Sequence, residues 1–361
     1  MLRHPKGALL ISTVAIAALA EPALGMHMKE GTLKTLPQSI PEVQTMQQIE
    51  SAFSSQGFTL DVAVTSGRAS EVTSDVVPAL RELAQQAASK GDLLAGADAV
   101  RTSSDGRTAV LTLASPHSAD LAASNQALDH VRDDLAPTLL DPLPASEWAV
   151  GGNIAESADS SQHQRDALPW VIGFVLLLTL LMMGFTFRSV PIAIITTVLN
   201  LASVAAAFGV LSLVFQHSWA EGMLDFTSSG YVIDWIPLFL FVVLVGLSMD
   251  YHVFVISRIR EGVLRGLPPR VAVEAGVTET AGVVTSAAAV MVSVFAIFAT
   301  LSMLEMKQMG VGLAVSILID ATVVRVVMLP SILALLGDRA WWPARVVRRQ
   351  PEPVEVEEPE R

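Results

Sequence analysis

Six long apolar stretches constrain the fold of this chain of 361 residues more than any other feature. A helix needs about 20 mostly apolar residues to cross the roughly 30 Å hydrocarbon core of a membrane. The composition agrees, because 52% of the residues are hydrophobic and only 16% are charged, against about 25% in soluble domains. The sequence therefore predicts a bundle of six transmembrane helices, at residues 8–20, 170–187, 192–215, 236–256, 282–302 and 311–336.

The first stretch, residues 8–20, has two interpretations. Arg3 and Lys6 precede a short apolar run that ends in Ala-Leu-Ala at 18–20, as in a secretory signal with a small-residue cleavage site. Apolar residues resume at 23–26 and lengthen the run toward a spanning helix. Composition alone leaves a cleaved signal and a retained helix both open.

The distribution of arginine predicts the orientation in the membrane, because short cytoplasmic loops carry an excess of Lys and Arg. Residues 216–235 contain neither Lys nor Arg, and the loop after the fifth stretch has only Lys307. The loops after the second, fourth and sixth stretches hold Arg188, Arg258, Arg260, Arg265, Arg270, Arg339, Arg345, Arg348 and Arg349. We therefore expect both termini in the cytoplasm and the long segment between the first two helices outside it. The predicted domains are a helix at 1–26, an external domain at 27–167, five helices at 168–338 and a cytoplasmic tail at 339–361.

The external segment has the pattern of an α/β domain. Its apolar residues alternate in the regions expected to be strands and follow helical spacing elsewhere. The order of elements, β-α-β-β-α-β, is that of the ferredoxin-like split unit. A further helix is expected at 41–53, and the Pro/Glu-rich residues 350–361 are expected to be disordered. The predicted strands are 58–66, 93–100, 108–114 and 148–150, and the predicted helices are 75–90 and 118–135, the second behind a serine cap at Ser118.

Several classes of function have no support in the sequence. The formal charge of −12 argues against a nucleic-acid binder, which needs a basic face. The absence of cysteine excludes disulfides, thiolate metal sites and a cysteine nucleophile. The chain contains no phosphate-binding loop of the GxxxxGKS or GxxxxGKT form, no HExxH and no GxSxG. The sequence predicts no catalytic, cofactor or metal site, and a protein that is not an enzyme.

Asp250, in the inner half of the fourth stretch, is the most informative residue. A charge at the centre of a spanning helix costs roughly 2.5–3.5 kcal/mol on insertion scales. No basic residue lies within one helical turn of Asp250. A low dielectric favours the neutral acid, which suits a group that takes up and releases protons, and Tyr251 supplies an adjacent hydroxyl. Asp250 and Tyr251 therefore predict a proton relay; the alternative is a structural acid held by interhelical hydrogen bonds.

Small residues recur every three or four positions along one face of the fifth stretch. Such a stripe lets helix backbones approach closely, and its hydroxyls can hydrogen-bond across the contact. We expect the stripe to serve packing, with Ser286 and Ser293 as candidate contacts to a carboxylate such as Asp250. Its members are Gly282, Ser286, Ala289, Ser293, Ala296 and Thr300.

Asp320 and Arg325 lie in the sixth stretch, five residues apart. At about 100° per residue of α-helix they are about 140° apart around the axis, which is poor geometry for an ion pair. We expect Arg325 to extend toward the inner surface and Asp320 to point into the bundle, as a second proton-handling or structural acid. Asn200 is expected to bond between helices, and His252 to lie at the interface, on another face from Asp250.

The residues around Asp250 resemble the hallmark of a known family. The runs GLSMDY at 246–251 and SRIRE at 257–261 are similar to the motif of the MMPL (mycobacterial membrane protein large) transporters, of the resistance-nodulation-division (RND) superfamily. The resemblance continues through VTSAAA at 284–289 and LIDATVVR at 318–325. Near the start, AEPALGM at 20–26 looks like the family's exit from the first helix of a repeat, which favours a retained helix.

The resemblance implies a bacterial inner-membrane transporter that exports lipids, hydrophobic compounds or drugs, driven by the proton-motive force. Asp250 would carry the proton and Tyr251 would be its hydrogen-bonding partner. The segment 27–167 would be a porter domain that passes substrate along outside the membrane. The implied partners are protons, membrane lipids and a hydrophobic or lipid substrate.

The chain departs from the family in its number of repeats. Family members have two repeats, twelve helices and two Asp-Tyr pairs. This chain has one repeat, six predicted helices and one Asp-Tyr pair, and it resembles the second repeat. It is therefore interpreted as a half-transporter that forms a homo-oligomer or pairs with a separate first-half subunit, or as a truncated fragment. The remaining alternative is a non-transporting, membrane-anchored binding or scaffold protein.

Overall fold

The computed structural model describes residues 4–31, 35–52, 59–89, 94–115, 121–143 and 146–343. The chain forms two compact units, one made of residues 1–36 with 166–361 and the other of residues 37–165. The serine predicted to cap a helix, Ser118, and the tail predicted to be disordered, 350–361, lie outside the described residues.

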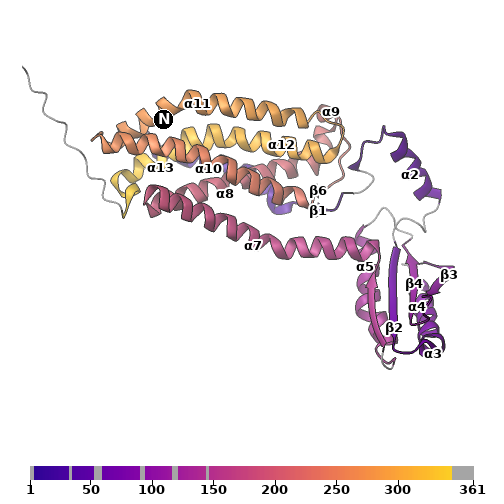
Figure 1. Cartoon of the computed structure of the whole chain (residues 1–361). Helices are drawn as coiled ribbons and strands as arrows, with labels where there is room; N and C mark the ends of the chain where they lie inside the picture. The colour runs from indigo at the N-terminus through magenta and orange to yellow at the C-terminus, as the bar shows by residue number, and fades with distance from the viewer. Residues whose placement is uncertain are drawn as a thin grey trace, which may run out of the picture. The chain divides into compact units, whose positions relative to one another are not determined.

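Six helices of the described chain are long and apolar enough to cross a membrane, which confirms the predicted number. Figure 1 shows them side by side in the first unit. They extend beyond the apolar stretches into flanking polar residues, and α7 begins within the residues of the second unit. They are α1 (Pro5–Ala20), which runs on into η1 (Glu21–Gly25), α7 (Asn153–Phe187), α8 (Val190–Phe215), α10 (Trp235–Leu264), α11 (Pro269–Phe298), and α12 (Leu304–Ile319), which runs on through η6 (Asp320–Met328), α13 (Leu329–Leu336) and η7 (Gly337–Trp341).

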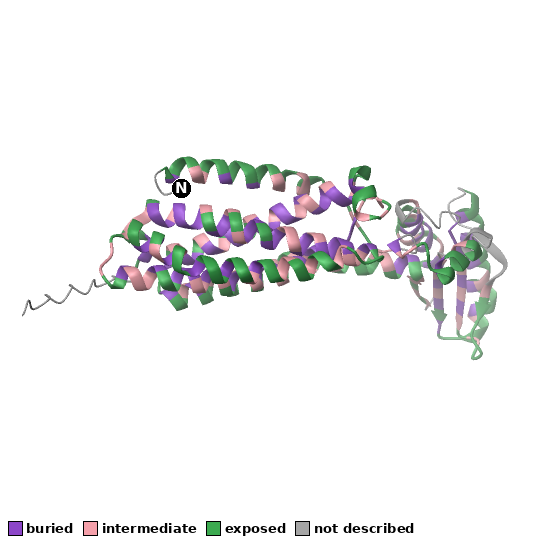
Figure 2. Cartoon of the chain, turned by 90° about the horizontal axis from the view of Figure 1, so that it is seen from above, coloured by how far each residue is buried: buried purple, intermediate pink, exposed green. Residues whose placement is uncertain are grey.

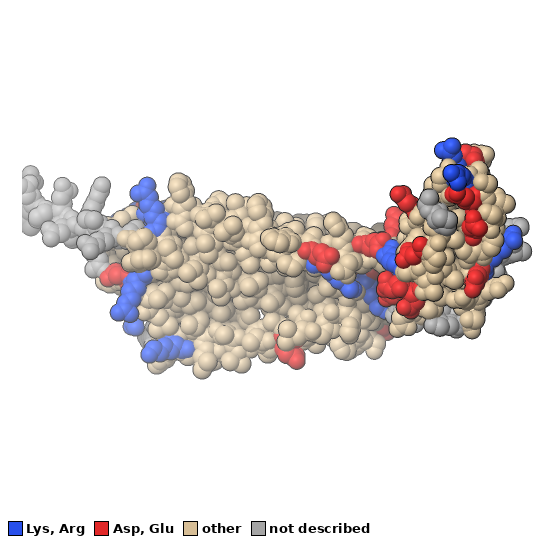
Figure 3. All heavy atoms as spheres, turned by 90° about the horizontal axis from the view of Figure 1, so that it is seen from below, with Lys and Arg blue, Asp and Glu red and all other residues tan. Residues whose placement is uncertain are grey.

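The helices of this unit differ in how far the bundle covers them. In the apolar part of α8, 61% of the residues are buried, and in that of α10 the share is 50%. In the apolar parts of α1, α7 and α11, only 11% of the residues are buried. Figure 2 shows exposed residues continuing along whole helices of the unit. On the face drawn in Figure 3, uncharged side chains cover most of the helical unit, and Lys and Arg gather at one of its ends. Such a surface suits contact with lipid.

A close backbone contact fastens α1 to α8. An ideal Cβ atom at Gly209 of α8 would lie 1.8 Å from the carbonyl oxygen of Leu19, so only glycine fits there. Ile16 of α1 is buried in the same helical core. The first predicted helix is therefore an integral part of this unit's packing.

A short ribbon and two buried polar side chains hold the loop between α8 and α10. The strand β1 (Met28–Lys29) pairs in parallel with β6 (Val232–Ile233). The Gln308 side chain accepts a hydrogen bond from the Ile233 amide at 3.0 Å. Lys307, expected in a loop, lies instead on α12, where its buried ammonium donates to the Leu224 carbonyl at 2.6 Å. The sequence analysis predicted neither the ribbon nor these contacts.

The second unit is a four-stranded antiparallel sheet with helices. The strands are ordered β3-β4-β2-β5, and every neighbouring pair is antiparallel. The sequence predicted each of these strands within about three residues of its observed ends. The strands are β2 (Thr59–Ser66), β3 (Leu94–Thr102), β4 (Thr108–Ala114) and β5 (Ser146–Gly151); the helical segments are α2 (Pro41–Ala52), α3 (Ala69–Glu71), η3 (Val72–Val76), α4 (Val77–Ser89), α5 (Leu121–Asp129), η4 (His130–Leu135) and α6 (Ala136–Leu140).

Alternation along the strands builds the core of this unit. Successive side chains of a strand point to opposite faces of the sheet, and every second residue of β2 is buried: the apolar Leu60, Val62 and Val64, then Ser66. Val62, at the centre of β2, is paired with Leu111 of β4 on one side and Val150 of β5 on the other. The core is completed by helix residues such as Leu80 and Val131.

The expected external domain, 27–167, is longer than this unit. Residues 28–29 pair with residues 232–233 and so belong with the helical unit, whose first segment ends at residue 36. The position of either unit relative to a membrane stays a prediction.

We expect the substitution Gly209→Ala to lower the thermal unfolding temperature of the detergent-solubilised protein. Overpacking a close contact costs about 1–3 kcal/mol, here because α1 has to move away from α8. The matched control is Gly173→Ala on α7, where a Cβ atom meets nothing within 4 Å and alanine favours the helix. Equal stability of the two variants would contradict the packing described here.

Candidate functional site

The predicted relay residues Asp250 and Tyr251 point in different directions from α10. Asp250 is exposed, and within the described residues no hydrogen bond or ion pair involves its carboxylate. It shares its helix face with Val242 and Gly246, which are also exposed. Tyr251 is half-buried, and the guanidinium carbon of Arg325 lies 4.7 Å from the centre of its ring. The tyrosine thus faces the bundle, whereas the aspartate faces away from it.

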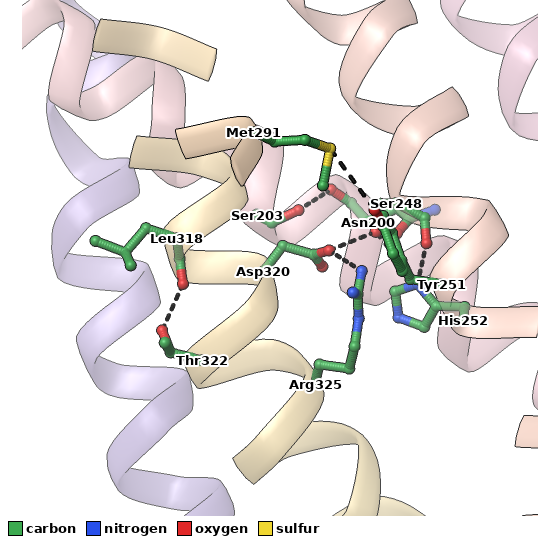
Figure 4. Close-up of polar contacts among 10 residues, drawn as sticks. All are labelled: Asn200, Ser203, Ser248, Tyr251, His252, Met291, Leu318, Asp320, Thr322 and Arg325. Carbon is green, nitrogen blue, oxygen red and sulfur yellow. Dashed lines mark hydrogen bonds and ion pairs between the residues drawn. The ribbon is translucent and has the colours of Figure 1, made fainter. Parts of the chain in front are cut away.

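A buried polar cluster lies where α8, α10 and η6 meet, as Figure 4 shows. The Ser248 hydroxyl is 2.9 Å from Oδ2 of Asp320 and 2.8 Å from Oδ1 of Asn200. Arg325 forms an ion pair with the same Asp320 oxygen. His252 Nδ1 is 2.9 Å from the Ser248 carbonyl oxygen and 3.2 Å from its hydroxyl. All five side chains are buried.

The expectation that Asp320 and Arg325 do not pair is wrong, and the shape of the helix explains why. The turns that begin at Asp320 form a π-helix, η6. Its i→i+5 hydrogen bonds bring residues five apart onto one face, whereas in an α-helix they point in different directions. Arg325 therefore stays inside the bundle, 4% exposed, and does not extend toward the surface.

The expectation that His252 lies at the interface is also wrong, because its side chain is 0% exposed. The sequence analysis gave Ser248 no role, although the spacing of Ser248 and His252 places them on one helix face. Asn200 contacts Ser248 across two helices, as predicted.

Polar atoms in this cluster have unused bonding capacity. Within the described residues, Asp320 Oδ1, Asn200 Nδ2, His252 Nε2 and Arg325 Nε have no hydrogen-bond partner. A small cavity of about 10 Å³ lies beside Asp320 and Arg325, and its lining includes Ser203, Ser316 and Tyr251 together with apolar residues. A polar cavity of that size holds about one water molecule. These side chains form one hydrogen-bonded network inside the bundle.

Ser286 and Ser293 do not join this cluster. Both are exposed on α11 and donate hydrogen bonds to carbonyl oxygens of their own helix, Val283 at 3.0 Å and Ala289 at 2.7 Å. The rest of the small-residue stripe is exposed as well, and α11 ends at Phe298, before Thr300. In the part of the chain that the structure describes, no hydrogen bond links either serine to Asp250. The described residues also hold no group of three His, Asp or Glu side chains that could bind a metal ion.

Removing the cation of the buried pair should destabilise the protein strongly. We expect Arg325→Met to cost about 3–5 kcal/mol, because it leaves the Asp320 carboxylate buried without a partner. The double variant Asp320→Asn with Arg325→Met should recover at least half of that loss. Thermal unfolding in detergent measures both, with the exposed Arg258→Met as the control. A double variant no more stable than Arg325→Met would show that the two side chains are not coupled.

Comparison with known proteins places these residues in a family. The family model described as "MMPL family" matches residues 34–354. MmpL11 of Mycolicibacterium smegmatis, named as an exporter of mycolic acid-containing lipids, is 30% identical over 99% of this chain and 37% of its own length. MmpL11 of Mycobacterium tuberculosis, named as a heme uptake protein, is 39% identical over 55% of this chain and 20% of its own length. The M. smegmatis trehalose monomycolate exporter MmpL3 is 30% identical over 61% of this chain and 22% of its own length.

This chain spans well under half the length of each of these relatives. The family match covers most of the chain, and it includes α10 and η6 with the polar cluster. The chain therefore belongs to the MMPL family of membrane proteins.

Proposed function

We propose that this chain is one half of a proton-driven transporter that exports lipids or other hydrophobic compounds across the bacterial inner membrane. In this proposal Asp250 binds and releases the driving protons, with Tyr251 as its neighbouring hydroxyl. A second six-helix bundle, from another copy of this chain or from a separate first-half subunit, completes the transporter. The chain is then a transporter and not an enzyme.

The observation that carries the proposal is the exposed position of Asp250 in the middle of α10. The same face carries Phe239, 38% exposed, and Val242, 42% exposed, so the carboxylate sits on an apolar stripe. An ionised carboxylate facing lipid at this depth is costly, and acids inside membranes almost always face a bundle interior or a water-filled cavity. We infer that partner helices cover this face.

The neighbouring helix supports the same inference. Helix α11 packs against α10, and its small residues are exposed; such residues let a partner helix approach closely. In this proposal Ser286 and Ser293 serve contacts with the partner. The greater length of the MMPL relatives also supports a second bundle, because this chain matches only 37% of the M. smegmatis lipid exporter.

The buried pair is the second charged centre of the proposed relay. Arg325 bonds Asp320 and also lies over the ring of Tyr251, next to Asp250 in the chain. A change in the charge of Asp250 that turns Tyr251 therefore reaches the Asp320–Arg325 pair directly. The driving force is the proton gradient, whose electrical part is worth about 2.3 kcal/mol per charge per 100 mV.

The sheet unit supplies the proposed substrate-handling part. Its strand order fits the ferredoxin-like split unit, and we propose that it is a porter domain on the outer side of the membrane, with both termini inside. The arginines at the helix ends support this orientation. The names of the relatives concern mycolic acid-containing lipids, trehalose monomycolate and heme, all largely apolar molecules, which supports an apolar substrate.

We expect Asp250→Asn to reduce proton-coupled transport more than tenfold while the protein stays folded. The reason is that a side-chain amide neither takes up nor releases a proton near neutral pH. The measurement uses the chain in proteoliposomes with its partner bundle, an imposed pH gradient and a trapped pH-sensitive dye. Asp225→Asn, in the exposed loop before α10, is the matched control and should keep the full rate. Unchanged proton movement in Asp250→Asn would favour the scaffold alternative.

Cross-linking tests the covered face, and the absence of native cysteine gives it a clean background. We expect Gly246→Cys, one turn from Asp250, to form a photo-cross-linked product in native membranes when its thiol carries a benzophenone maleimide. A product of twice the chain mass indicates a homo-oligomer, and another mass indicates a separate first-half subunit. Leu178→Cys on α7, 54% exposed, is the control and should stay unlinked. No product from Gly246→Cys would count against a partner on this face.

A further inference from the structure

His252 is a buried titratable side chain that the relay proposed above does not use. It lies on α10, two residues after Asp250, and is 0% exposed. Its Nδ1 atom contacts the Ser248 carbonyl oxygen at 2.9 Å and the Ser248 hydroxyl at 3.2 Å. Within the described residues, its other ring nitrogen, Nε2, has no hydrogen-bond partner.

These contacts select one tautomer of the neutral imidazole. A carbonyl oxygen only accepts hydrogen bonds, so the 2.9 Å contact requires the ring proton on Nδ1. The Nε2 atom of the neutral ring then carries a lone pair and can accept a proton. The ring therefore has one nitrogen that donates toward Ser248 and one that can take up a proton.

Ser248 connects this ring to Asp320. Its hydroxyl has one hydrogen, and the strongest acceptor in reach is the Asp320 carboxylate at 2.9 Å. Asn200 can then turn its amide nitrogen toward the serine oxygen, because the two ends of an amide exchange by a half-turn. That orientation also uses Nδ2, which otherwise lacks a partner within the described residues. Donation thus runs from His252 to Ser248 to Asp320.

We propose that His252 passes protons to Asp320 through Ser248, as a further relay residue of the transporter proposed above, on which this inference rests. A hydronium ion gives a proton to Nε2 and leaves as water; the Nδ1–H bond breaks and its hydrogen moves to Ser248 Oγ. The serine O–H bond breaks at the same time, and its hydrogen moves to Asp320. One proton has then passed from Nε2 to Asp320, the serine hydroxyl is restored, and the imidazole is neutral with its hydrogen on Nε2.

The surrounding charges suit a relay and not a proton store. The charged side chains of this cluster are Asp320 and Arg325, both on η6, and they form an ion pair. Asn200 of α8 is neutral and contacts Ser248. A protonated imidazole beside an ion pair of zero net charge gains little electrostatic stabilisation, so the proton moves on to Asp320. Arg325 then lacks its counter-ion, which favours release of the proton again.

Nitrogen-15 NMR of His252 tests the geometry without any transport assay. The probe is a chain with the other six histidines changed to Gln, labelled on the imidazole nitrogens and placed in lipid nanodiscs. We expect a protonated Nδ1 and an unprotonated Nε2 at neutral pH, and exchange of the ring proton with water that slows more than tenfold in Ser248→Ala. The opposite tautomer, or exchange that Ser248→Ala leaves unchanged, would overturn the proposal.

Proton movement in proteoliposomes separates a relay from a merely structural histidine. His252→Gln keeps an amide donor for Ser248 but cannot take up a proton, so we expect at least a tenfold lower rate and a flatter pH profile between pH 5 and 8. His217→Gln, in an exposed loop, is the control and should behave like the unchanged chain. If Asp250→Asn stops proton movement but His252→Gln leaves rate and pH profile unchanged, this inference fails while the transporter stands. If Asp250→Asn changes nothing, the proposed function fails, and the NMR result still decides the role of His252.

Discussion

The ion pair between Asp320 and Arg325 places the strongest demand on the helical unit. Two charges among apolar helices are stable only if each is compensated and the remaining polar atoms are bonded. Ser248 of α10 supplies such a bond to Asp320, and Asn200 of α8 contacts Ser248 in turn. The π-helical turns of η6 bring the two charges onto one face. The positions of three helices therefore follow from one buried pair. Close contacts such as Gly209 against Leu19 then add α1 to this arrangement.

Asp250, in contrast to Asp320, has no compensating cation among the described residues. This carboxylate is as far from the ends of α10 as Ser248 is, yet it lies on the exposed face and no described residue compensates it. A chain that pairs one buried acid with a cation and leaves another uncovered on an apolar stripe is consistent with a bundle that is completed by further helices. The exposed small residues of α11 fit that reasoning, since their stripe has no partner helix within the described unit.

Hydrophobic periodicity was enough to predict the six helices and the four strands, because burial of apolar side chains sets both patterns. It could not predict the pairing of Asp320 with Arg325, since that depends on π-helical turns that composition does not encode. Nor could it predict that His252 is buried: a histidine near the end of an apolar stretch is compatible with interface and interior alike. The roles of Asp250 and Tyr251 were inferred from an uncompensated acid inside an apolar stretch and from a family motif, and they stay predictions.

Tyr251 links the two parts of the proposed relay physically. It directly follows Asp250, which lies on the exposed side of α10, while its own ring lies under the Arg325 guanidinium inside the bundle. A cation over an aromatic ring is attracted by about 0.5–2 kcal/mol, enough to bias the position of Arg325 without fixing it. If partner helices draw Tyr251 outward when Asp250 changes charge, Arg325 loses that contact and Asp320 becomes the stronger partner for the guanidinium. Proton binding at Asp250 would then be coupled to proton binding at Asp320, because each change of charge at Asp250 alters how strongly Arg325 stabilises the ionised form of Asp320.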